Sequence, residues 1–485
     1  MATGAEGAAE PDAEALRRRR PWILAATIVA SSMGFIDSTL VHVALPRLQA
    51  DLGASFAEAQ WVSNAYMLML GGLILAGGGL GDRLGRRRVF VGGLCAFTAA
   101  SALCALAPDG PFLIAARALQ GAGAAVMTPQ SLAILSAAYP RAERGRAIGL
   151  WAAAAAATTS LGPAAGSLLI DGLGWRWAFW VNLPFGALAL VLALRFVPES
   201  RDVRAGPLDW PGALLATLGC GALAFGLTLA AEGGGATAWG LCALGLAALA
   251  GFVAQEGRAQ APIMPLALFG SRAFSAINGA TFLLYLALGS MLFLVPFDLG
   301  ARRDWAAWET SLTLLPLGVA IAALSRPAGA LADRIGVRPM LTLGAGIVAA
   351  ACAWASLAGE GAVGAAGPMI VLALGMSAVV APLSAGVMAA APDAQAGAAS
   401  GVSNAASRLA NLFAVAGCGA VASAVHAAAS GPGAATFGAL PPIGDPARAA
   451  AEAAYLAGYG AALRLAAAMA LAASALSWLG LRRGS

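Results

Sequence analysis

The sequence contains no lysine, only two histidines and few charged residues of any kind, since Asp, Glu, Lys and Arg together make up 11% of it. Without lysine there is no Gly-x-x-x-x-Gly-Lys loop, so nothing indicates direct coupling to ATP. The six cysteines are scattered singly through apolar segments, and His42 and His426 lie far apart, so no spacing typical of metal ligands exists. We therefore expect no metal, no cofactor and no enzymatic site.

Hydrophobic residues make up 60% of the chain, and the mean hydropathy is +0.78. An ordinary soluble surface needs about a quarter of the residues to be charged, so most of this surface must face lipid. The apolar runs are unbroken, as in membrane helices, rather than alternating as in barrel strands. The first run is long and lacks a small-residue cleavage site, so we expect it to stay as the first helix. The sequence predicts an all-α polytopic membrane protein with about 14 transmembrane helices, at 22–45, 58–78, 88–107, 111–136, 146–170, 176–197, 209–230, 237–255, 273–297, 309–328, 338–358, 363–388, 399–425 and 455–480.

Arginines are distributed unequally between the two sides of the predicted membrane. The loops on one side hold most of them, beginning with Arg17 to Arg20, whereas the other side holds only Arg47, Arg176, Arg302, Arg303 and Arg448. The positive-inside rule then places both termini in the cytoplasm. The net charge of +5 is explained by this topology and by contact with anionic lipid head groups, so no nucleic-acid partner is expected. Abundant Ala, Gly and Arg suggest a GC-rich bacterial coding sequence. We therefore expect the protein in a bacterial plasma membrane.

One phrase occurs twice, at 78–87 and at 329–338, each time between two apolar runs. Such duplication indicates two related halves, as in many transporters. Eight predicted helices separate the copies where two six-helix halves would leave six, so a pair of helices is inserted between the halves. The predicted units are a disordered cytoplasmic tail at 1–20, a six-helix bundle at 21–200, a linker with two additional helices at 201–262 and a second six-helix bundle at 263–485.

The repeated phrase predicts a gate at the cytoplasmic side. Its glycines let two helix ends approach, and its Asp lies near the start of the next helix, where the helix dipole favours a carboxylate that can bind guanidinium groups. The arginines have an alternative interpretation as mere positive-inside charge, but the acids have no topological use. The predicted gate comprises Gly78, Asp82, Arg83, Gly85, Arg86 and Arg87 in the first copy and Gly329, Asp333, Arg334 and Gly336 in the second.

Among the charged residues inside predicted spans, two are candidate site residues, Asp37 in the first span and Arg117 in the fourth. An embedded charge costs at least ~2.5 kcal/mol, so each side chain should face the bundle interior and find a partner. We expect the two residues at different heights along the bilayer normal. Purely structural pairing is the alternative for Arg117. His42 is five residues from Asp37, about 140° around a helix, so the two should not share a face, and a polar packing role is favoured over proton relay.

Several phrases together carry a family resemblance. They are 78–87, Arg117 to Gly123, Gly162 to Gly166, Asp37 to Pro46, Gln60 to Val62 with Tyr66, and Trp175 to Pro184. In this order they resemble the major facilitator superfamily, and within it the fourteen-helix branch of drug/proton antiporters. The sequence departs from the family pattern at three positions. Thr158 and Ser167 stand where that family often has glycine, and His42 stands where it usually has asparagine.

The resemblance implies a proton-coupled secondary active transporter that exports hydrophobic or cationic drugs or antibiotics by alternating access. Its expected partners are protons, a small-molecule substrate and the lipid bilayer, and it is expected to work as a monomer. An importer of a small solute, or a non-transporting membrane sensor, are the alternatives. The implied site has Asp37 as the protonation site and Arg117 as its charge balance, with Tyr66, His42 and Gln120 at the cavity, and an antiporter helix marked by Gly162, Pro163 and Gly166.

Overall fold

The computed structural model describes residues 9–201, 208–357, 359, 361–392, 395–430, 436–442 and 445–481. Within these residues every regular element is a helix. Thirteen helices are long and apolar enough to cross a membrane. A further long helix, α4, carries the buried polar residues Arg117, Gln120 and Gln130 on its inner face. The fold class predicted from the sequence is confirmed.

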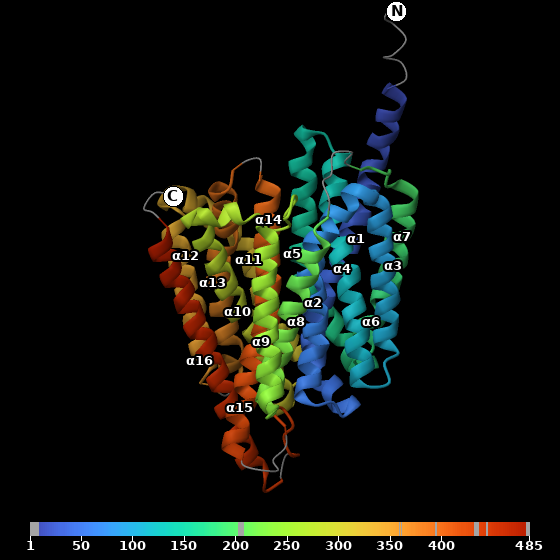
Figure 1. Cartoon of the computed structure of the whole chain (residues 1–485). Coiled ribbons are helices and arrows are strands. Elements are labelled where there is room, and N and C mark those ends of the chain that lie inside the picture. The colour runs from blue at the N-terminus through green and yellow to red at the C-terminus, as the bar shows by residue number, and fades with distance from the viewer. Residues whose placement is uncertain are drawn as a thin grey trace, which may run out of the picture.

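The N-terminal bundle contains the first six predicted spans, the last of them divided between two helices (Figure 1). The first five helices each match one predicted span, with ends that differ by a few residues in most cases, and α6 and α7 share the sixth. Its helices are α1 (Ala9–Leu52), α2 (Phe56–Leu84), α3 (Arg86–Ala105), α4 (Gly110–Ala138), α5 (Arg141–Leu173), the short α6 (Trp177–Trp180) and α7 (Asn182–Phe196).

Two further helices form the inserted hairpin, α8 (Trp210–Ala231) and α9 (Gly235–Glu256). They pack closely on each other, because Gly219 and Gly226 of α8 lie directly against the backbone of α9. The hairpin contacts α2 of the first bundle and α15 of the second. It therefore covers one of the seams between the bundles (Figure 1).

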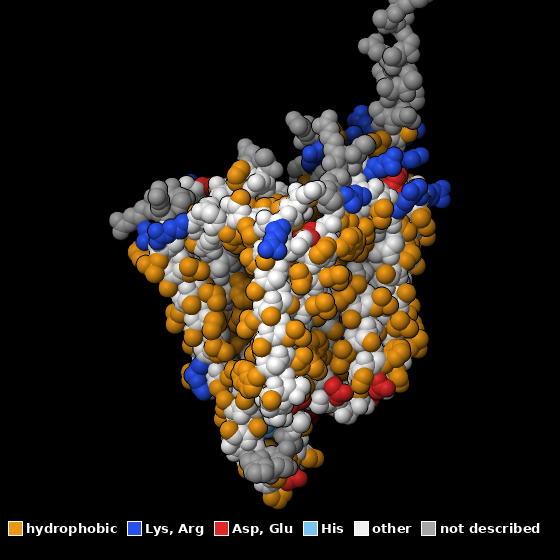
Figure 2. Space-filling view, viewed as in Figure 1, with side chains coloured by type: hydrophobic (Ala, Val, Ile, Leu, Met, Phe, Trp, Pro, Cys, Tyr) orange, Lys and Arg blue, Asp and Glu red, His pale blue; other side chains and the backbone are white. Residues whose placement is uncertain are grey.

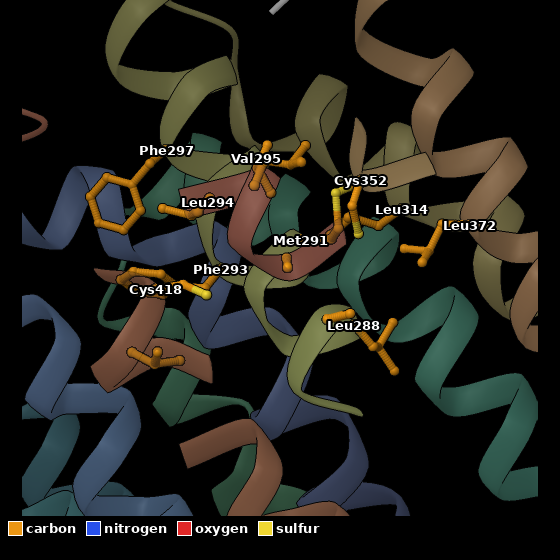
Figure 3. Packing of buried hydrophobic residues seen from close by; sticks show 14 of the residues in the cluster. Leu288, Met291, Phe293, Leu294, Val295, Phe297, Leu314, Cys352, Leu372 and Cys418 are labelled. Atoms are coloured by element: carbon orange, nitrogen blue, oxygen red, sulfur yellow. The ribbon is translucent and has the colours of Figure 1, made fainter. Parts of the chain in front are cut away.

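The C-terminal bundle is built around α10, whose side chains meet those of α11, α12, α13 and η4 in a buried apolar cluster that includes Met291, Leu314, Cys352 and Cys418 (Figure 3). Its elements are η1 (Leu266–Gly270), α10 (Arg272–Phe297), η2 (Asp298–Arg302), α11 (Ala307–Ile335), α12 (Val337–Ala355), α13 (Gly361–Ala390), α14 (Ala396–Phe413), η4 (Ala414–Cys418), α15 (Gly419–Ser430) and α16 (Arg448–Gly480).

One boundary differs clearly from the sequence expectation. α1 begins at Ala9, so the prediction of a disordered tail over 1–20 is wrong for residues 9–20. These residues continue the first helix because Ala, Leu, Glu and Arg are good helix formers and Arg18 pairs with Glu14 one turn away. Residues 1–8 of that tail, and 202–207 of the linker, lie outside the described residues.

The surface matches a membrane environment (Figure 2). A wide band of apolar side chains surrounds the middle of the molecule, with large exposed examples such as Leu218, Trp239 and Leu343. Basic residues gather at the end of the molecule where α1 begins and α16 ends. The end where α1 stops and α11 starts is called the outer end below, and the basic end the inner end.

The two bundles meet tightly at the outer end. The carboxylate of Asp171, at the end of α5, accepts hydrogen bonds from the backbone N–H groups of Ala307 (3.0 Å) and Trp308 (2.8 Å) at the start of α11. Arg47 of α1 forms an ion pair with the same carboxylate. Nearby, Phe56 of the first bundle packs against Phe293 and Phe297 of the second. The outer end is therefore closed in this conformation by contacts between the halves.

Candidate functional site

The most deeply buried charges of the first bundle form a direct ion pair. Arg117 Nη1 lies 2.6 Å from Asp37 Oδ2, and both side chains are at most 1% exposed. Gln120 donates from Nε2 to Asp37 Oδ1 (2.8 Å), and Arg117 donates from Nε to the carbonyl of Val62 (3.0 Å). A buried pair of this kind is tolerated when the remaining hydrogen-bonding groups are also satisfied, as they are here.

Two neighbours of this pair were not identified by sequence reasoning. Asn182 donates to Asp37 Oδ1 (3.4 Å) and to the hydroxyl of Ser101 (3.3 Å), which also accepts from Gln120 (2.9 Å). Asn182 belongs to the phrase at Trp175 to Pro184, which gave a family signal but no role. Ser101 gave no signal, because an isolated serine in an apolar run is common.

The expectation that Asp37 and Arg117 lie at different heights is wrong. The 2.6 Å contact between their side chains puts the two residues at the same depth in the bundle. α1 runs toward the outer end, whereas α4 begins there at Gly110, so Arg117, about two turns into α4, reaches Asp37 in the outer half of α1. The antiparallel directions of α1 and α4 thus bring the residues together.

Tyr66 lies beside this ion pair. Its ring covers the guanidinium of Arg117 at 4.3 Å, and Phe179 lies 5.7 Å from the same group. Tyr66 is almost completely buried, so it packs on the arginine instead of lining the central cavity. Its contact with Arg117 is a cation–π interaction in an apolar setting, and its expected role in proton coupling or substrate binding stays a prediction.

A central cavity of about 400 Å³ lies between the two bundles. The first bundle contributes Ser38, Thr39 and His42 of α1 to its wall, together with residues of α2 and α5. Asp37 faces the other way, into its own bundle, so Asp37 and His42 lie on different faces of α1 as predicted. The His42 ring packs edge-on against Phe293, 6.3 Å between centroids, in agreement with a packing role.

The second bundle contributes Arg408 of α14 to the same cavity, a residue that the sequence analysis missed. It lies inside the predicted span 399–425, so its embedded charge was the signal that could have found it. Among the described residues that line the cavity there is no carboxylate. A cationic substrate would meet a like charge here, so the cationic part of the expected substrate class does not fit this conformation.

The predicted antiporter helix packs closely on α1. A Cβ atom at Gly162 would lie 2.7 Å from Ile36, and one at Gly166 would lie 2.5 Å from Leu40. Pro163, between them, lines the cavity. The glycines therefore allow α1 and α5 to approach, and the proline places a residue without an N–H donor beside the substrate space.

The first copy of the repeated phrase forms an ordered corner at the inner end. Asp82 pairs with Arg86 one turn later (2.8 Å), across the break between α2 and α3 where Gly85 has φ +105°. Glu199, which sequence reasoning missed, accepts from the backbone N–H groups of Arg87 (3.1 Å) and Arg88 (3.2 Å) at the start of α3. Gly78 lies next to Pro129, 3.7 Å from the position of a Cβ, and Arg83 is exposed. These contacts join helices within one bundle.

The second copy has the same backbone but not the same pair. Gly336 has φ +93°, the counterpart of Gly85, and Gly329 lies 3.7 Å from Ala381 by the same measure as Gly78. Asp333 and Arg334 are exposed, and no hydrogen bond or ion pair of Asp333 occurs with any described residue. The reason lies in the sequence, because Val337 stands where the first copy has Arg86.

Comparison with known proteins agrees with this geometry. The solved bacterial homologue of the human lysosomal transporter Spinster, in an inward-facing and occupied conformation, superposes with a TM-score of 0.68 at 17% identity, over 96% of this chain and 97% of that one. The POT family transporter PepTSo superposes with a TM-score of 0.66 at 14% identity, over 96% of this chain and 97% of that one. At such identities these likenesses establish the fold alone.

Relatives with higher identity include several resistance proteins. The multidrug resistance protein Stp of Mycobacterium tuberculosis is 38% identical over 66% of this chain and 60% of its own length. The puromycin resistance protein pur8 of Streptomyces alboniger is 37% identical over 63% and 61%, and the tetracenomycin C resistance and export protein of Streptomyces glaucescens is 35% identical over 72% and 65%. The chain thus spans less than two thirds of the length of each. With the family model matching residues 27–415, the chain belongs to the Major Facilitator Superfamily, a family of membrane transporters.

Proposed function

We propose that the protein is a proton-coupled secondary active transporter that exports hydrophobic drugs or antibiotics by alternating access. We place it as a monomer in the bacterial plasma membrane, with both termini in the cytoplasm. The observation that carries the proposal is the buried pair of Asp37 and Arg117, which lies behind the α1 residues that line the central cavity. An ionisable pair at membrane depth that faces the bundle interior is typical of coupling sites. The resistance proteins among the relatives support export rather than uptake.

Asp37 is proposed as the protonation site. In the described conformation the carboxylate is bound to Arg117, and both side chains are buried. Proton uptake then requires a conformation in which the pair separates and water reaches Asp37. Once neutral, Asp37 no longer binds the guanidinium, which retains its other acceptors, the Val62 carbonyl and the Gln120 amide oxygen.

α1 connects this event to the cavity. It carries Asp37 on one face and Ser38, Thr39 and His42 on the other, so a shift of α1 on protonation changes both sites together. A proton and a substrate that prefer different conformations of one element are coupled without any covalent step. Gly162, Pro163 and Gly166 serve this scheme by keeping α5 in contact with α1.

The two repeated loops are proposed as the inner gate. Gly78, Asp82, Arg83, Gly85, Arg86 and Arg87 form the ordered half, and Gly329, Asp333, Arg334 and Gly336 form a half whose charges are free to meet it. With the outer end closed by Asp171, the described contacts favour a conformation in which the inner gate is the one able to open. The unpaired Asp333 then finds a partner when the inner ends approach.

Everted membrane vesicles from a strain without its own pumps test this function. An imposed inside-acid gradient is followed with a pH-sensitive acridine dye while tetracenomycin C is added. An exporter that exchanges protons dissipates the gradient on addition, and Asp37→Asn abolishes the response. Asp109→Asn is the matched control, because Asp109 caps α4 at the surface and Asn caps a helix equally well. Full activity of Asp37→Asn contradicts the coupling role, and gradient-driven uptake into intact cells establishes the importer instead.

A further inference from the structure

One helix contributes four polar residues to the central cavity. Asn404, Ser407, Arg408 and Asn411 of α14 all line it, at spacings of three and four residues that place them on one side of a helix. The lining from α10, α11 and α13 is mainly apolar, with residues such as Leu288, Leu314 and Met376. The cavity volume lies within the range of ordinary ligand pockets.

Arg408 differs from its neighbours in having no partner. The asparagines and the serine are satisfied within their own helix, since Asn404 donates to the carbonyl of Ser400 (3.1 Å), Ser407 to that of Asn404 (2.8 Å) and Asn411 to that of Ser407 (3.0 Å). No hydrogen bond or ion pair joins the Arg408 guanidinium to any described residue, although its side chain is only partly exposed. All five of its N–H donors therefore remain available.

The charges around the cavity do not neutralise Arg408. The described lining residues include no carboxylate, and Asp37 is already paired with Arg117 behind α1. An arginine at membrane depth normally pairs or marks a substrate pathway, because an unpaired cation there is costly. A cavity with low-dielectric walls and one positive charge concentrates anions. The guanidinium fork suits a carboxylate in particular, because it donates two parallel hydrogen bonds.

We propose that Arg408 binds the anionic group of the transported molecule, and that the substrates are amphipathic organic anions with a carboxylate or phenolate at one end of an apolar body. The anion pairs with Arg408 on the polar face of α14, while the body lies against Leu288, Leu314 and Met376. This proposal rests on the proposed function as a transporter and adds the charge of its substrate. It also gives Arg408 the partner that the protein itself does not supply.

Binding of two dyes with the same xanthene ring system and opposite charge tests the proposal. Fluorescein carries the anion and rhodamine 6G the cation, and anisotropy is measured on the full chain in phosphatidylcholine nanodiscs, with empty nanodiscs subtracted. We expect wild type to prefer fluorescein. Arg408→Gln should weaken fluorescein binding by about 10- to 100-fold, the loss of one or two charge-assisted hydrogen bonds, and leave rhodamine 6G binding unchanged or stronger. Arg408→Lys should retain most of the preference for the anion.

Arg464→Gln is the matched control, since Arg464 is an exposed arginine of α16 that is not among the residues lining the cavity. It should leave both dyes unaffected. Fluorescein binding that is the same in wild type and Arg408→Gln overturns the proposal, as does a wild-type preference for rhodamine 6G. If Arg408→Gln fails to fold, loss of the preference in Arg408→Glu or its retention in Arg408→Lys decides the question.

Two further experiments complete the test. One distinguishes a lipid phosphate from a free anion, and the other distinguishes failure of the Arg408 site from failure of the transport function. Phosphatidylglycerol in the nanodiscs displaces fluorescein only if a lipid phosphate also occupies Arg408, which supports the same anion chemistry from a different source. Dye binding without gradient-driven flux contradicts the transport function and leaves the Arg408 site intact. If a proton gradient drives export of rhodamine 6G equally in wild type and Arg408→Gln, the proposed Arg408 site is contradicted and the transport function stands.

Discussion

The two bundles share a repeated phrase but treat their charges differently. In the N-terminal bundle the embedded Arg117 is paired with Asp37, and Asp82 of the inner loop is paired with Arg86. In the C-terminal bundle Arg408 and Asp333, which face the cavity and the inner surface, have no partner among the described residues. Duplication of a fold therefore did not preserve its charge pairs. At these positions the first bundle balances its charges and the second leaves them available, although at its outer end the second bundle pairs Asp298 with Arg302 and Arg303.

The largest effect is expected at the paired arginine. Arg117→Gln leaves Asp37 as a buried uncompensated charge, and it should lower the free energy of unfolding by about 3–5 kcal/mol. The double variant Asp37→Asn with Arg117→Gln should recover most of this loss, because both charges are then gone. Unfolding in mixed micelles measures the three proteins. A double variant as unstable as Arg117→Gln alone would contradict the interpretation of a balanced pair. Recovery of stability without recovery of gradient-driven flux assigns the pair to coupling as well.

A smaller effect is expected where the two halves meet. Asp171→Ala removes an acceptor shared by Ala307, Trp308 and Arg47 at the closed outer end. Hydrogen bonds to a charged group contribute about 1.5–3 kcal/mol, so the equilibrium should move toward an open outer end. Labelling of a cysteine introduced at Thr39 by an impermeant reagent applied from outside measures the shift. Asp304→Asn is the control, since Asp304 lies nearby without a hydrogen bond to these groups and asparagine tolerates its φ of 54°. Unchanged labelling in Asp171→Ala would show that aromatic packing alone keeps this end closed.

A change of one residue should give the second loop the pair that it lacks. Val337→Arg places a guanidinium four residues after Asp333, at the position that Arg86 occupies after Asp82. An exposed pair at this spacing contributes about 0.3–0.5 kcal/mol. A double-mutant cycle with Asp333→Asn measures the coupling through the free energy of unfolding. A coupling energy of zero would show that the corner at Gly336 does not reproduce the geometry of the corner at Gly85.

The smallest effect on stability is expected at Arg408, in contrast to its proposed effect on binding. Arg408→Gln breaks no ion pair, so the free energy of unfolding should change by less than about 0.5 kcal/mol or increase slightly. The same unfolding experiment in mixed micelles compares the change in the free energy of unfolding of Arg408→Gln with that of Arg117→Gln. A loss as large as that of Arg117→Gln would mean that Arg408 has a structural partner, and the contrast between the bundles would then fail at this position.

The fold was predictable because a bilayer imposes a length and an apolarity on every helix that crosses it. The predicted spans lie within a few residues of the observed helices at most ends, and the inserted pair of helices followed from counting spans between the two repeated phrases. The helix over residues 9–20 was not predicted, because these residues are mostly polar. A run of apolar residues indicates only the part of a helix that lies in lipid.

The candidate site was predictable only in part. Asp37, Arg117 and Gln120 came from embedded polarity and from family phrases, and they lie together. Tyr66 and Arg408 show the limit, since one is covered by Arg117 and the other is exposed to the cavity. Which of two embedded side chains faces a cavity depends on the rotation of each helix against its neighbours, and single-residue patterns do not contain that information.

The contact between α1 and α5 has a mechanical consequence. Because Gly162 and Gly166 have no side chains, α1 and α5 pack in direct contact. We therefore expect the two helices to move together as one rigid unit. The bonds from Asp171 to the start of α11, by contrast, can be replaced by bonds to water at a cost of about 1.5–3 kcal/mol. Any motion that exposes the outer mouth therefore carries α1, and the acid on it, along with α5 as one body.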